Sequence, residues 1–216
     1  MRSAPGLTAR DCPSCGAPVT FASAQSLLAV CGYCRATLLR HDLDVEQIGT
    51  MAALLEDVTP LQLGVEGVWR GTHFAVVGRL QIRWERGRWN EWYCVFDDGR
   101  TGWLGDAAGA YAVSFEVADP GPLPAFESLR PGGGVTLQGV AYEVTDVREA
   151  EVVAGEGELP FRVDAGWKTR TADLRTATAR FATLDYSDAA PRLYAGEAVE
   201  LAALKPRGLR EVEGSR

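Results

Sequence analysis

Four cysteines near the amino terminus have the spacing of metal ligands. Cys12 and Cys15 form one C-x-x-C pair, Cys31 and Cys34 form a second, and fifteen residues separate the pairs. Two residues between cysteines let the chain turn tightly and direct both sulfurs at one point, as in four-thiolate zinc ribbons. The spacing predicts a bound Zn²⁺ ion with a structural role, because four thiolates leave no coordination position open for a reacting water.

Disulfides, free thiols and an iron–sulfur cluster are the alternative uses of these cysteines. The first residues, MRSAPGLTARD, contain no apolar stretch of the kind that a secretory signal needs. We therefore expect a cytoplasmic protein, and disulfides are rare in that reducing compartment. The two-and-two symmetry of the cysteine pairs favours zinc, and iron stays the open alternative for the metal.

Residues 1–43 are predicted to form the zinc ribbon. Pro18–Phe21 and Leu27–Val30 are expected to pair as a hairpin between the cysteine pairs. Gly16 and Gly32 are expected to supply the positive φ angles that direct backbone amides at sulfur. A segment this short buries little apolar surface, so the metal is expected to supply its folding free energy, about 10 kcal/mol or more in comparable peptides.

The remaining reactive side chains do not assemble into a catalytic group. His41 and His73 are the only histidines, and we expect His73 at the surface, in a Gly-Thr-His turn. Cys94 lies in a strand of aromatic residues, which favours a buried, inert thiol. The glycines 132–134 lack the Lys and Ser/Thr of a phosphate-binding loop. The sequence therefore predicts a protein that is not an enzyme.

Tryptophan is concentrated in one part of the chain. Five of the six tryptophans fall between residues 69 and 103, interleaved with arginines. They either form a core or line an exposed groove for a peptide or another extended ligand. We therefore take these five as a candidate ligand or partner surface: Trp69, Trp84, Trp89, Trp92 and Trp103.

The elements that must position these residues begin after the ribbon. The chain has 216 residues, of which 46% are hydrophobic, and no apolar run is long enough to cross a membrane as a helix. Residues 44–58 are predicted to form a connecting helix. Asp44 is placed to cap it, and Val45, Ile48 and Met51 recur at helical spacing.

From residue 59 the pattern changes to short alternating segments separated by turn residues, as in small barrels and sandwiches. We predict a first β module at 59–118, a linker at 119–131, a second β module at 132–204 and a flexible tail at 205–216. The fold class is therefore mainly β, with an amino-terminal zinc ribbon, one connecting helix and two tandem small β-barrel or sandwich modules.

Two landmarks of the first module recur in the second. Gly71–Val76 aligns with Gly139–Val144, and Asp106–Gly109 aligns with Asp188–Pro191. The landmarks occur in the same order in both segments, which predicts an internal tandem repeat. The alternative is two unrelated β segments that share common turn chemistry.

The distribution of charge bears on the partners. The net charge is −7, and residues 44–204 hold fourteen basic and twenty-five acidic side chains. An acidic body repels phosphate backbones, so nucleic acid is an unfavourable partner except at the ribbon and the tail. The same charge attracts small cations.

Several of these motifs together resemble a known family. CPSCGAPVTF, CGYCRATL, GVWRGTHFAVVGRLQIRW and WNEWYCVFDDGRTGWL are similar to the bacterial domain-of-unknown-function family numbered 4178. The family has no established activity. Its genes often lie beside those for polyamine biosynthesis enzymes, small membrane proteins and envelope-stress proteins, so the resemblance implies an accessory role in one of these systems.

Two functions from different classes follow. The first is a zinc-ribbon binding or scaffold protein with a protein partner in an envelope-stress or polyamine-linked system, including peripheral membrane association through that partner. The second is an enzyme subunit or binder that acts on a small polyamine-like cation. A flat aromatic strip favours the first, whereas a deep pocket lined by Asp or Glu with aromatic walls favours the second.

Overall fold

The computed structural model describes residues 8–41, 44–164 and 166–212 of the chain and confirms a mainly β fold. The ribbon strands are β1 (Thr8–Asp11), β2 (Pro18–Phe21), β3 (Leu28–Val30), β4 (Ala36–His41) and β5 (Asp44–Thr50). The body begins with β6 (Glu66–Trp69), β7 (Thr72–Trp84), β8 (Gly87–Phe96), β9 (Thr101–Ala107) and β10 (Ala110–Glu116). It continues with β11 (Gly134–Leu137), β12 (Val140–Leu159), β13 (Lys168–Arg175), β14 (Arg180–Asp185) and β15 (Arg192–Val199).

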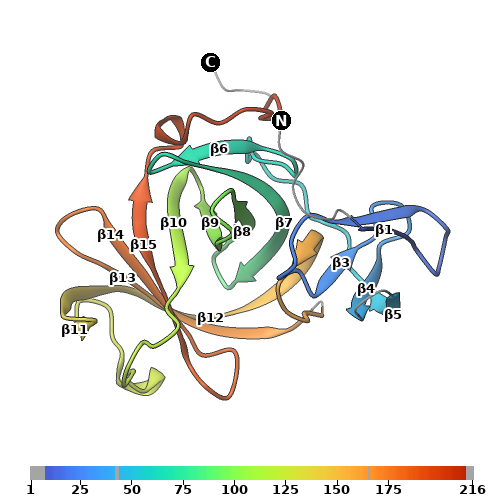
Figure 1. Ribbon diagram of the computed structural model, residues 1–216. Helices are drawn as coiled ribbons and strands as arrows, with labels where there is room; N and C mark the ends of the chain where they lie inside the picture. The colour runs from blue at the N-terminus through green and yellow to red at the C-terminus, as the bar shows by residue number, and fades with distance from the viewer. Residues whose placement is uncertain (1–7, 42–43, 165, 213–216) are drawn as a thin grey trace.

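Eight strands close into an antiparallel barrel (Figure 1). The order around it is β7, β8, β9, β10, β15, β14, β13 and β12, and β12 pairs back with β7 to complete the circle. Closure satisfies the backbone hydrogen bonds of both edges that an open sheet would expose. Within the described part of the chain, no helix is both long enough and apolar enough to span a bilayer.

The two predicted β modules are joined in this single barrel. Residues 59–118 supply β7 to β10 and residues 132–204 supply β12 to β15, and the halves pair at β10–β15 and at β7–β12. The expectation of two separately closed modules is therefore wrong. Each half is a meander of four strands with two edge strands. The free backbone N–H and C=O groups of these edge strands find their partners only in the other half.

The halves nevertheless share their layout. A two-residue turn with positive φ precedes each long strand, at Arg70-Gly71 before β7 and at Gln138-Gly139 before β12. A register shift follows at matching places, between Val76 and Gly78 in β7 and between Val144 and Asp146 in β12. The residues that align in the sequence, Gly71–Val76 and Gly139–Val144, therefore occupy equivalent hairpins of the two halves. This layout agrees with an internal duplication, which stays a prediction.

Each half also has an apolar core of its own on the outer side of the barrel wall. The first core joins buried residues of β7 to β10 to the segment 61–69 and to the 3-10 helix Leu201–Leu204. The second joins residues of β12 to β15 to β11 and to Leu129, which follows the 3-10 helix Phe126–Ser128. The covering segments thus bury the outward-facing apolar side chains of the barrel strands.

The predicted helix at 44–58 is absent. Residues 44–50 form β5, which pairs with β4, and residues 51–61 cross the outer surface of the barrel without regular structure. The β4–β5 ladder shifts register opposite Ile48, which is left unpaired between Gln47 and Gly49. Val45 packs against the cysteine cluster, whereas Ile48 and Met51 pack in the cluster that contains Trp103. The three residues have helical spacing in the sequence but do not form one apolar stripe.

The predicted hairpin of β2 with β3 is also wrong. β2 pairs with β1, and β3 pairs with β4 on one side and with the end of β12 on the other. Each cysteine pair therefore lies in the turn of a separate hairpin. Through β3, the ribbon sheet is continuous with the barrel sheet, and in Figure 1 the ribbon strands extend to one side of the barrel.

Closure of the barrel leaves no room for a side chain at Gly78. A Cβ atom there would lie 1.7 Å from the carbonyl oxygen of Glu158 on β12. We expect Gly78→Ala to destabilise the protein by about 3 kcal/mol or more, since the two backbones must separate. Denaturant unfolding measures the loss. Gly134→Ala is the control, because nothing lies within 4 Å of its added Cβ, and equal stability of the two variants would contradict the prediction.

Candidate metal centre and barrel cavity

The four amino-terminal cysteines meet at one point. Their Sγ atoms all lie within 4.8 Å of one another. The Sγ atoms of Cys12 and Cys34 are 3.7 Å apart, as are those of Cys15 and Cys31. A disulfide requires about 2.05 Å, whereas sulfurs bound to one tetrahedral metal at about 2.3 Å lie about 3.8 Å apart. The arrangement therefore fits a metal ion and not disulfides.

Both cysteine turns are built in the same way. The amide of Gly16 donates to the carbonyl of Cys12 at 2.8 Å, and that of Arg35 donates to the carbonyl of Cys31 at 2.9 Å. The left-handed residues are Gly16 and Arg35, so the expectation of a positive φ at Gly32 is wrong. The Arg35 guanidinium donates two hydrogen bonds to the carbonyl oxygen of Met51, at 2.9 and 3.1 Å, which holds this unfavourable conformation in place.

The electrostatics of the cysteine cluster also call for a cation. The backbone amide of Ala36 is the largest influence on Cys34, whose pKa falls to about 6. The amide of Ala17 acts to lower the pKa of Cys15, but burial and the neighbouring thiols together raise it to about 12. Thiols this close cannot all ionise unless positive charge compensates them, and a divalent metal ion supplies that charge.

A buried carboxylate fastens the ribbon to the barrel. Glu158, near the end of β12, is 6% exposed. It accepts hydrogen bonds from the backbone amides of Ala22 at 2.6 Å and Ser23 at 3.3 Å. The residues on either side of it pair with β3. The connection between β2 and β3 is thereby held against the barrel wall by the same strand that continues the sheet.

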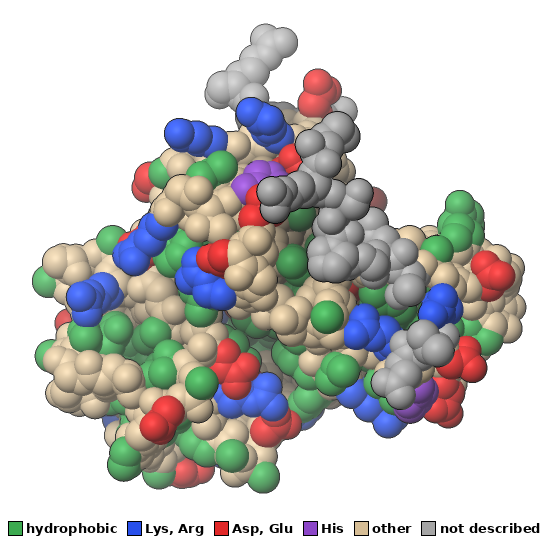
Figure 2. All heavy atoms as spheres, in the orientation of Figure 1, with side chains coloured by type: hydrophobic (Ala, Val, Ile, Leu, Met, Phe, Trp, Pro, Cys, Tyr) green, Lys and Arg blue, Asp and Glu red, His purple; other side chains and the backbone are tan. Residues whose placement is uncertain are grey.

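The barrel encloses a cavity of about 500 Å³, to which all eight barrel strands contribute. Small-molecule sites typically have volumes of about 300 to 1,000 Å³. Figure 2 views the molecule as in Figure 1, and the surface is hollowed near its centre, with hydrophobic side chains and charges of both signs close by. The barrel therefore has room in its lumen for a small ligand.

The lumen is more polar than the outer side of the same strands. On β14, Thr183 and Asp185 line the cavity, while Ala182 and Leu184 belong to the outer apolar core. Alternate residues of a strand point to opposite faces, so one face is buried as core and the other is left to line the cavity. β13 follows the same rule.

Five acidic side chains line the lumen: Glu91, Asp146, Asp173, Asp185 and Asp188. Glu91 on β8 accepts a hydrogen bond from Nε1 of Trp89 at 2.8 Å, and Asp173 on β13 accepts one from the Thr183 hydroxyl at 2.8 Å. Burial raises the pKa of Glu91 to about 8, and the charge of Asp173 adds to this. Burial also raises the pKa of Asp173, against the opposing effects of Thr183 and Arg148. Glu91 is therefore largely protonated near neutral pH.

One arginine of the lumen is held by side chains of the protein, although its buried Nε has no hydrogen-bond partner. The Arg148 guanidinium stacks on Trp84 and Trp89, 4.6 and 5.1 Å from the ring centroids, and pairs with Asp146. Trp89 thus contacts Arg148 with its face and Glu91 with its N–H group. This chain of contacts fixes the positions of the charged groups along one side of the cavity.

A different wall of the lumen is apolar. It is lined by aliphatic residues of β7 and β12 and by rings from β9 and from the connection between β12 and β13. The Phe161 ring lies 5.8 Å from Trp103 and 6.0 Å from Trp167, centroid to centroid. Trp103 and Phe161 also share an apolar cluster with Leu28 and Val30 of the ribbon. The cavity wall and the ribbon are therefore packed as one unit.

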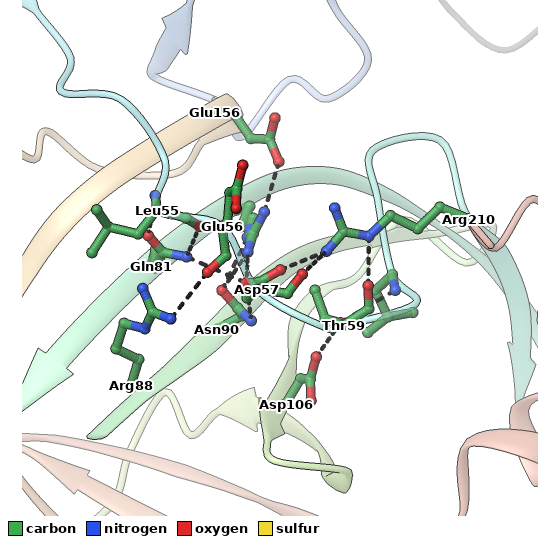
Figure 3. Close-up of polar contacts among 12 residues, drawn as sticks. Leu55, Glu56, Asp57, Thr59, Gln81, Arg88, Asn90, Asp106, Glu156 and Arg210 are labelled. Atoms are coloured by element: carbon green, nitrogen blue, oxygen red, sulfur yellow. Dashed lines mark hydrogen bonds and ion pairs between the residues drawn. The ribbon is translucent and has the colours of Figure 1, made fainter. Parts of the chain in front are cut away.

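A second polar cluster lies outside the lumen (Figure 3). Asp57 forms ion pairs with Arg79 of β7 and with Arg210, and it accepts a hydrogen bond from Asn90 of β8 at 3.1 Å. Thr59 donates to Asp106. Each charge of this cluster has a partner from the protein. The cluster is structural, because it holds residues 55–59 and the carboxyl-terminal segment against the barrel.

The five candidate tryptophans are divided between the core and the lumen. Trp69 and Trp92 are buried in the first outer core, and Arg79 stacks over Trp92 with its guanidinium 4.6 Å from the ring centroid. Trp89 and Trp103 line the cavity. Trp84 is half-buried against Arg148. No exposed strip forms from these five residues.

The other candidates lie away from the cavity. Cys94 is buried in the first outer core, and burial raises the pKa of its thiol. His73 is 40% exposed, within 3.5 Å of Glu66 and 3.4 Å of Asp97, and His41 is 55% exposed beside Glu46. Asp97 and Asp98 precede the turn glycine between β8 and β9. Their positions agree with structural roles.

The functional residues that the sequence analysis missed are the carboxylates of the lumen. Glu91 and Asp173 lie in strands that read as ordinary half-exposed strands, with polar and apolar residues alternating. The available signal was the polar face of TRTADLR and RFATLD, which carries both Thr and Asp. Alternation alone does not say whether a polar face meets solvent or encloses a cavity.

Comparison with known proteins agrees with the barrel as the defining part of the chain. Residues 62–201 match the family described as Domain of unknown function (DUF4178). This chain belongs to that family. No curated protein and no solved structure matches it.

The part of the chain that matches DUF4178 runs from just before β6 to the start of the last 3-10 helix. It contains all eight barrel strands and all five acidic side chains of the lumen, and it leaves out the cysteine ribbon. A shared property of DUF4178 proteins is therefore to be sought in the barrel, while the metal centre belongs to the preceding segment.

Removal of the metal is expected to unfold the ribbon and leave the barrel folded, because the barrel has apolar cores of its own. We expect Cys31→Ser to abolish metal binding and to remove hydrogen-exchange protection from residues 8–50, while residues 62–201 stay protected. Elemental analysis and exchange mass spectrometry measure the two effects. Cys94→Ser should keep the full metal content, and an unchanged ribbon in Cys31→Ser would contradict the assignment.

The raised pKa of Glu91 gives a dependence of stability on pH. The unfolded chain loses this proton near pH 4.5 and the folded chain near pH 8. The folded state therefore binds more protons between these values, and stability falls as the pH rises through this window. Glu91→Gln should flatten the fall in the unfolding free energy between pH 5 and 9. Glu149→Gln, at an exposed site on β12, should not, and equal slopes in both variants would refute the effect.

Proposed function

We propose that this protein binds a small organic cation in the lumen of its barrel and holds a structural zinc ion in its ribbon. The observation that carries the first part is a cavity of about 500 Å³ that is lined by five acidic and three basic side chains and has aromatic walls. Carboxylates and aromatic faces together recognise alkylammonium groups, by charge and by cation–π attraction.

The protonation of the lumen supports the cation. Without a ligand, burial keeps Glu91 largely protonated near neutral pH and raises the pKa of Asp173. A bound ammonium group would compensate their negative charge and would lower both pKa values. Water solvates the carboxylates of the lumen poorly. A ligand with a positive charge therefore stabilises their ionised form more than a neutral ligand does.

Binding is favoured over catalysis by the side chains that surround the cavity. Neither histidine and no cysteine of the described residues lines it. The buried thiol of Cys94 points into the outer core. A barrel of this kind can select and retain a ligand, so we propose a binder or a ligand-binding subunit, without a reaction of its own.

Zinc is proposed as the metal because four sulfurs surround a single point with the distances of a tetrahedral site. Such a site is closed to substrate, so its role is to fold the ribbon. Of the systems to which the family resemblance points, the polyamine-linked one agrees with a cation-binding lumen. A protein partner stays a prediction for the ribbon, where Tyr33 is 77% exposed on the second cysteine turn.

Isothermal titration calorimetry tests the proposed lumen site. The amines titrated are putrescine, spermidine, n-hexylamine and 2-phenylethylamine. We expect at least one of them to bind at one site per chain and to release protons on binding. The measured heat should then vary with the ionisation enthalpy of the buffer. Glu91→Gln and Asp173→Asn should each weaken binding about tenfold or more, the size of one charge-assisted hydrogen bond.

The control for this experiment is Glu149→Gln, which removes one negative charge from the outer surface. If all three variants weaken binding equally, the cation is attracted by the net charge of the body and not by the lumen. The absence of binding by every amine in the set would refute the proposed function.

A further inference from the structure

The second cysteine turn, Cys31–Cys34, is joined to the barrel on both of its sides. Before the turn, β3 ends at Val30 and pairs with residues 157–159 of β12. After the turn, the Arg35 guanidinium donates two hydrogen bonds to the carbonyl oxygen of Met51, at 2.9 and 3.1 Å. The carbonyl of Arg35 also accepts a hydrogen bond from the Met51 amide at 2.9 Å. The first cysteine turn lies between β1 and β2, which form a separate two-stranded sheet.

The side chains that flank the second turn are buried at the apolar wall of the lumen. Leu28, Val30 and Met51 are at most 9% exposed and belong to one apolar cluster. Other members of that cluster line the cavity: Leu80, Ile82, Trp103, Val152, Phe161 and Trp167. The ribbon therefore contributes directly to the packing of this wall.

Met51 makes the most direct of these contacts. A Cβ atom added to Gly155 of β12 would lie 3.5 Å from Cε of Met51 and 3.5 Å from Cδ2 of Leu80. The methyl group of Met51 and a side chain of the cavity lining thus lie over the same residue of β12. Met51 follows the end of β5, and both hydrogen-bonding groups of its backbone are occupied by Arg35. Its position therefore depends on the cysteine turn.

The conformation of that turn depends on the cysteine cluster. Arg35 has a φ of 64°, which is unfavourable for a residue with a Cβ atom. Such a conformation persists only where the surrounding structure holds it. A metal bound by the four cysteines would hold the turn closed. Without the ion the turn can relax, and the contacts from Arg35 to Met51 are then lost.

We propose that the apolar wall of the lumen has its ligand-binding shape only when the cysteine cluster holds its metal, and that Arg35 is the positioning residue that links the two. Loss of the metal withdraws Leu28, Val30 and Met51 from the wall, and closely packed neighbours must move with them. The dependence of the wall on the metal follows from packing. Its consequence for ligand binding rests on the proposed cation-binding function.

Fluorine NMR of protein labelled with 5-fluorotryptophan tests the link, because the six tryptophans report on different parts of the barrel. Substitution of each tryptophan by Phe assigns its resonance. We expect removal of Zn²⁺ by a chelator to shift the resonances of Trp103 and Trp167, which lie in the wall cluster. The resonances of Trp69 and Trp92, in the first outer core, should stay in place. Addition of Zn²⁺ should restore the original spectrum.

A variant that keeps the metal separates the role of Arg35 from the folding of the ribbon. Arg35→Gly removes the guanidinium, and glycine tolerates the positive φ, so elemental analysis should find the full zinc content. With zinc bound, its Trp103 resonance should move part of the way towards the metal-free position. Arg40→Gln is the matched control. The Arg40 guanidinium donates to the carbonyls of Ser23 and Ala24 within the ribbon, so this variant should keep the zinc-bound spectrum.

Calorimetric titration of the zinc-bound and zinc-free protein tests the consequence for binding. The probes are putrescine, spermidine, n-hexylamine and 2-phenylethylamine. We expect each amine that binds the zinc-bound protein to bind the zinc-free protein several-fold more weakly, because part of the wall that it contacts has moved.

The outcomes distinguish this inference from the function on which its binding part rests. If no amine binds either form, the proposed cation-binding function fails, and the fluorine resonances still decide whether the wall depends on the metal. Equal affinity of an amine for both forms would leave the cation-binding function standing and would refute its dependence on metal.

The spectra can overturn the structural link in three ways. Unchanged resonances of Trp103 and Trp167 in the zinc-free protein would refute it. An equal shift of Trp69 and Trp92 would also refute it, since the metal would then support the whole barrel and not this wall. A wild-type spectrum of zinc-bound Arg35→Gly would refute the role of Arg35.

Discussion

The structure depends on the pairing of one strand, β12, with strands from every other part of the chain. Over its twenty residues β12 pairs with β11 and β13 of its own half, with β7 of the other half and with β3 of the ribbon. The crossing with β7 is so close that Gly78 and Gly157 admit no side chain. Barrel closure, attachment of the ribbon and the shape of the cavity are therefore consequences of a single set of backbone hydrogen bonds.

Closing the sheet in this way determines where apolar and polar residues are buried. In many small barrels the interior is filled by side chains. Here each half buries its apolar residues on the outer side of the wall, under its own covering segments, as with Val144 and Leu174 in the second half. The lumen therefore does not have to supply the whole hydrophobic core of the protein. It can keep carboxylates, hydroxyls and an arginine whose burial would destabilise an ordinary barrel interior.

The sequence predicted the parts of the fold that local chemistry determines. Cysteine spacing located the four sulfurs that meet, and the recurring landmarks that begin at Gly71 and Gly139 start in hairpin turns. Prediction failed for the features of the fold that depend on pairing between strands far apart in the sequence. The three-residue spacing of Val45, Ile48 and Met51 made a strand look helical, although these side chains pack in two different clusters, and no local pattern shows that β10 pairs with β15 or β7 with β12. The carboxylates of the site come from these two halves, so their meeting was equally out of reach of the sequence.

The ribbon and the lumen are connected by packing, which bears on why one chain holds both. Leu28 and Val30 of the ribbon share an apolar cluster with Trp103, Val152 and Phe161 at the cavity wall. A metal bound by the four cysteines would fix the ribbon, and through β3 the ribbon pairs with one end of β12. Apolar clusters of this kind transmit displacements because they are closely packed. A metal in this cluster would thus support the shape of the wall that a ligand would contact, while the carboxylates are positioned by strands farther from it. The two ends of the lumen consequently depend on different parts of the protein, the apolar end on the ribbon and the acidic end on the barrel alone.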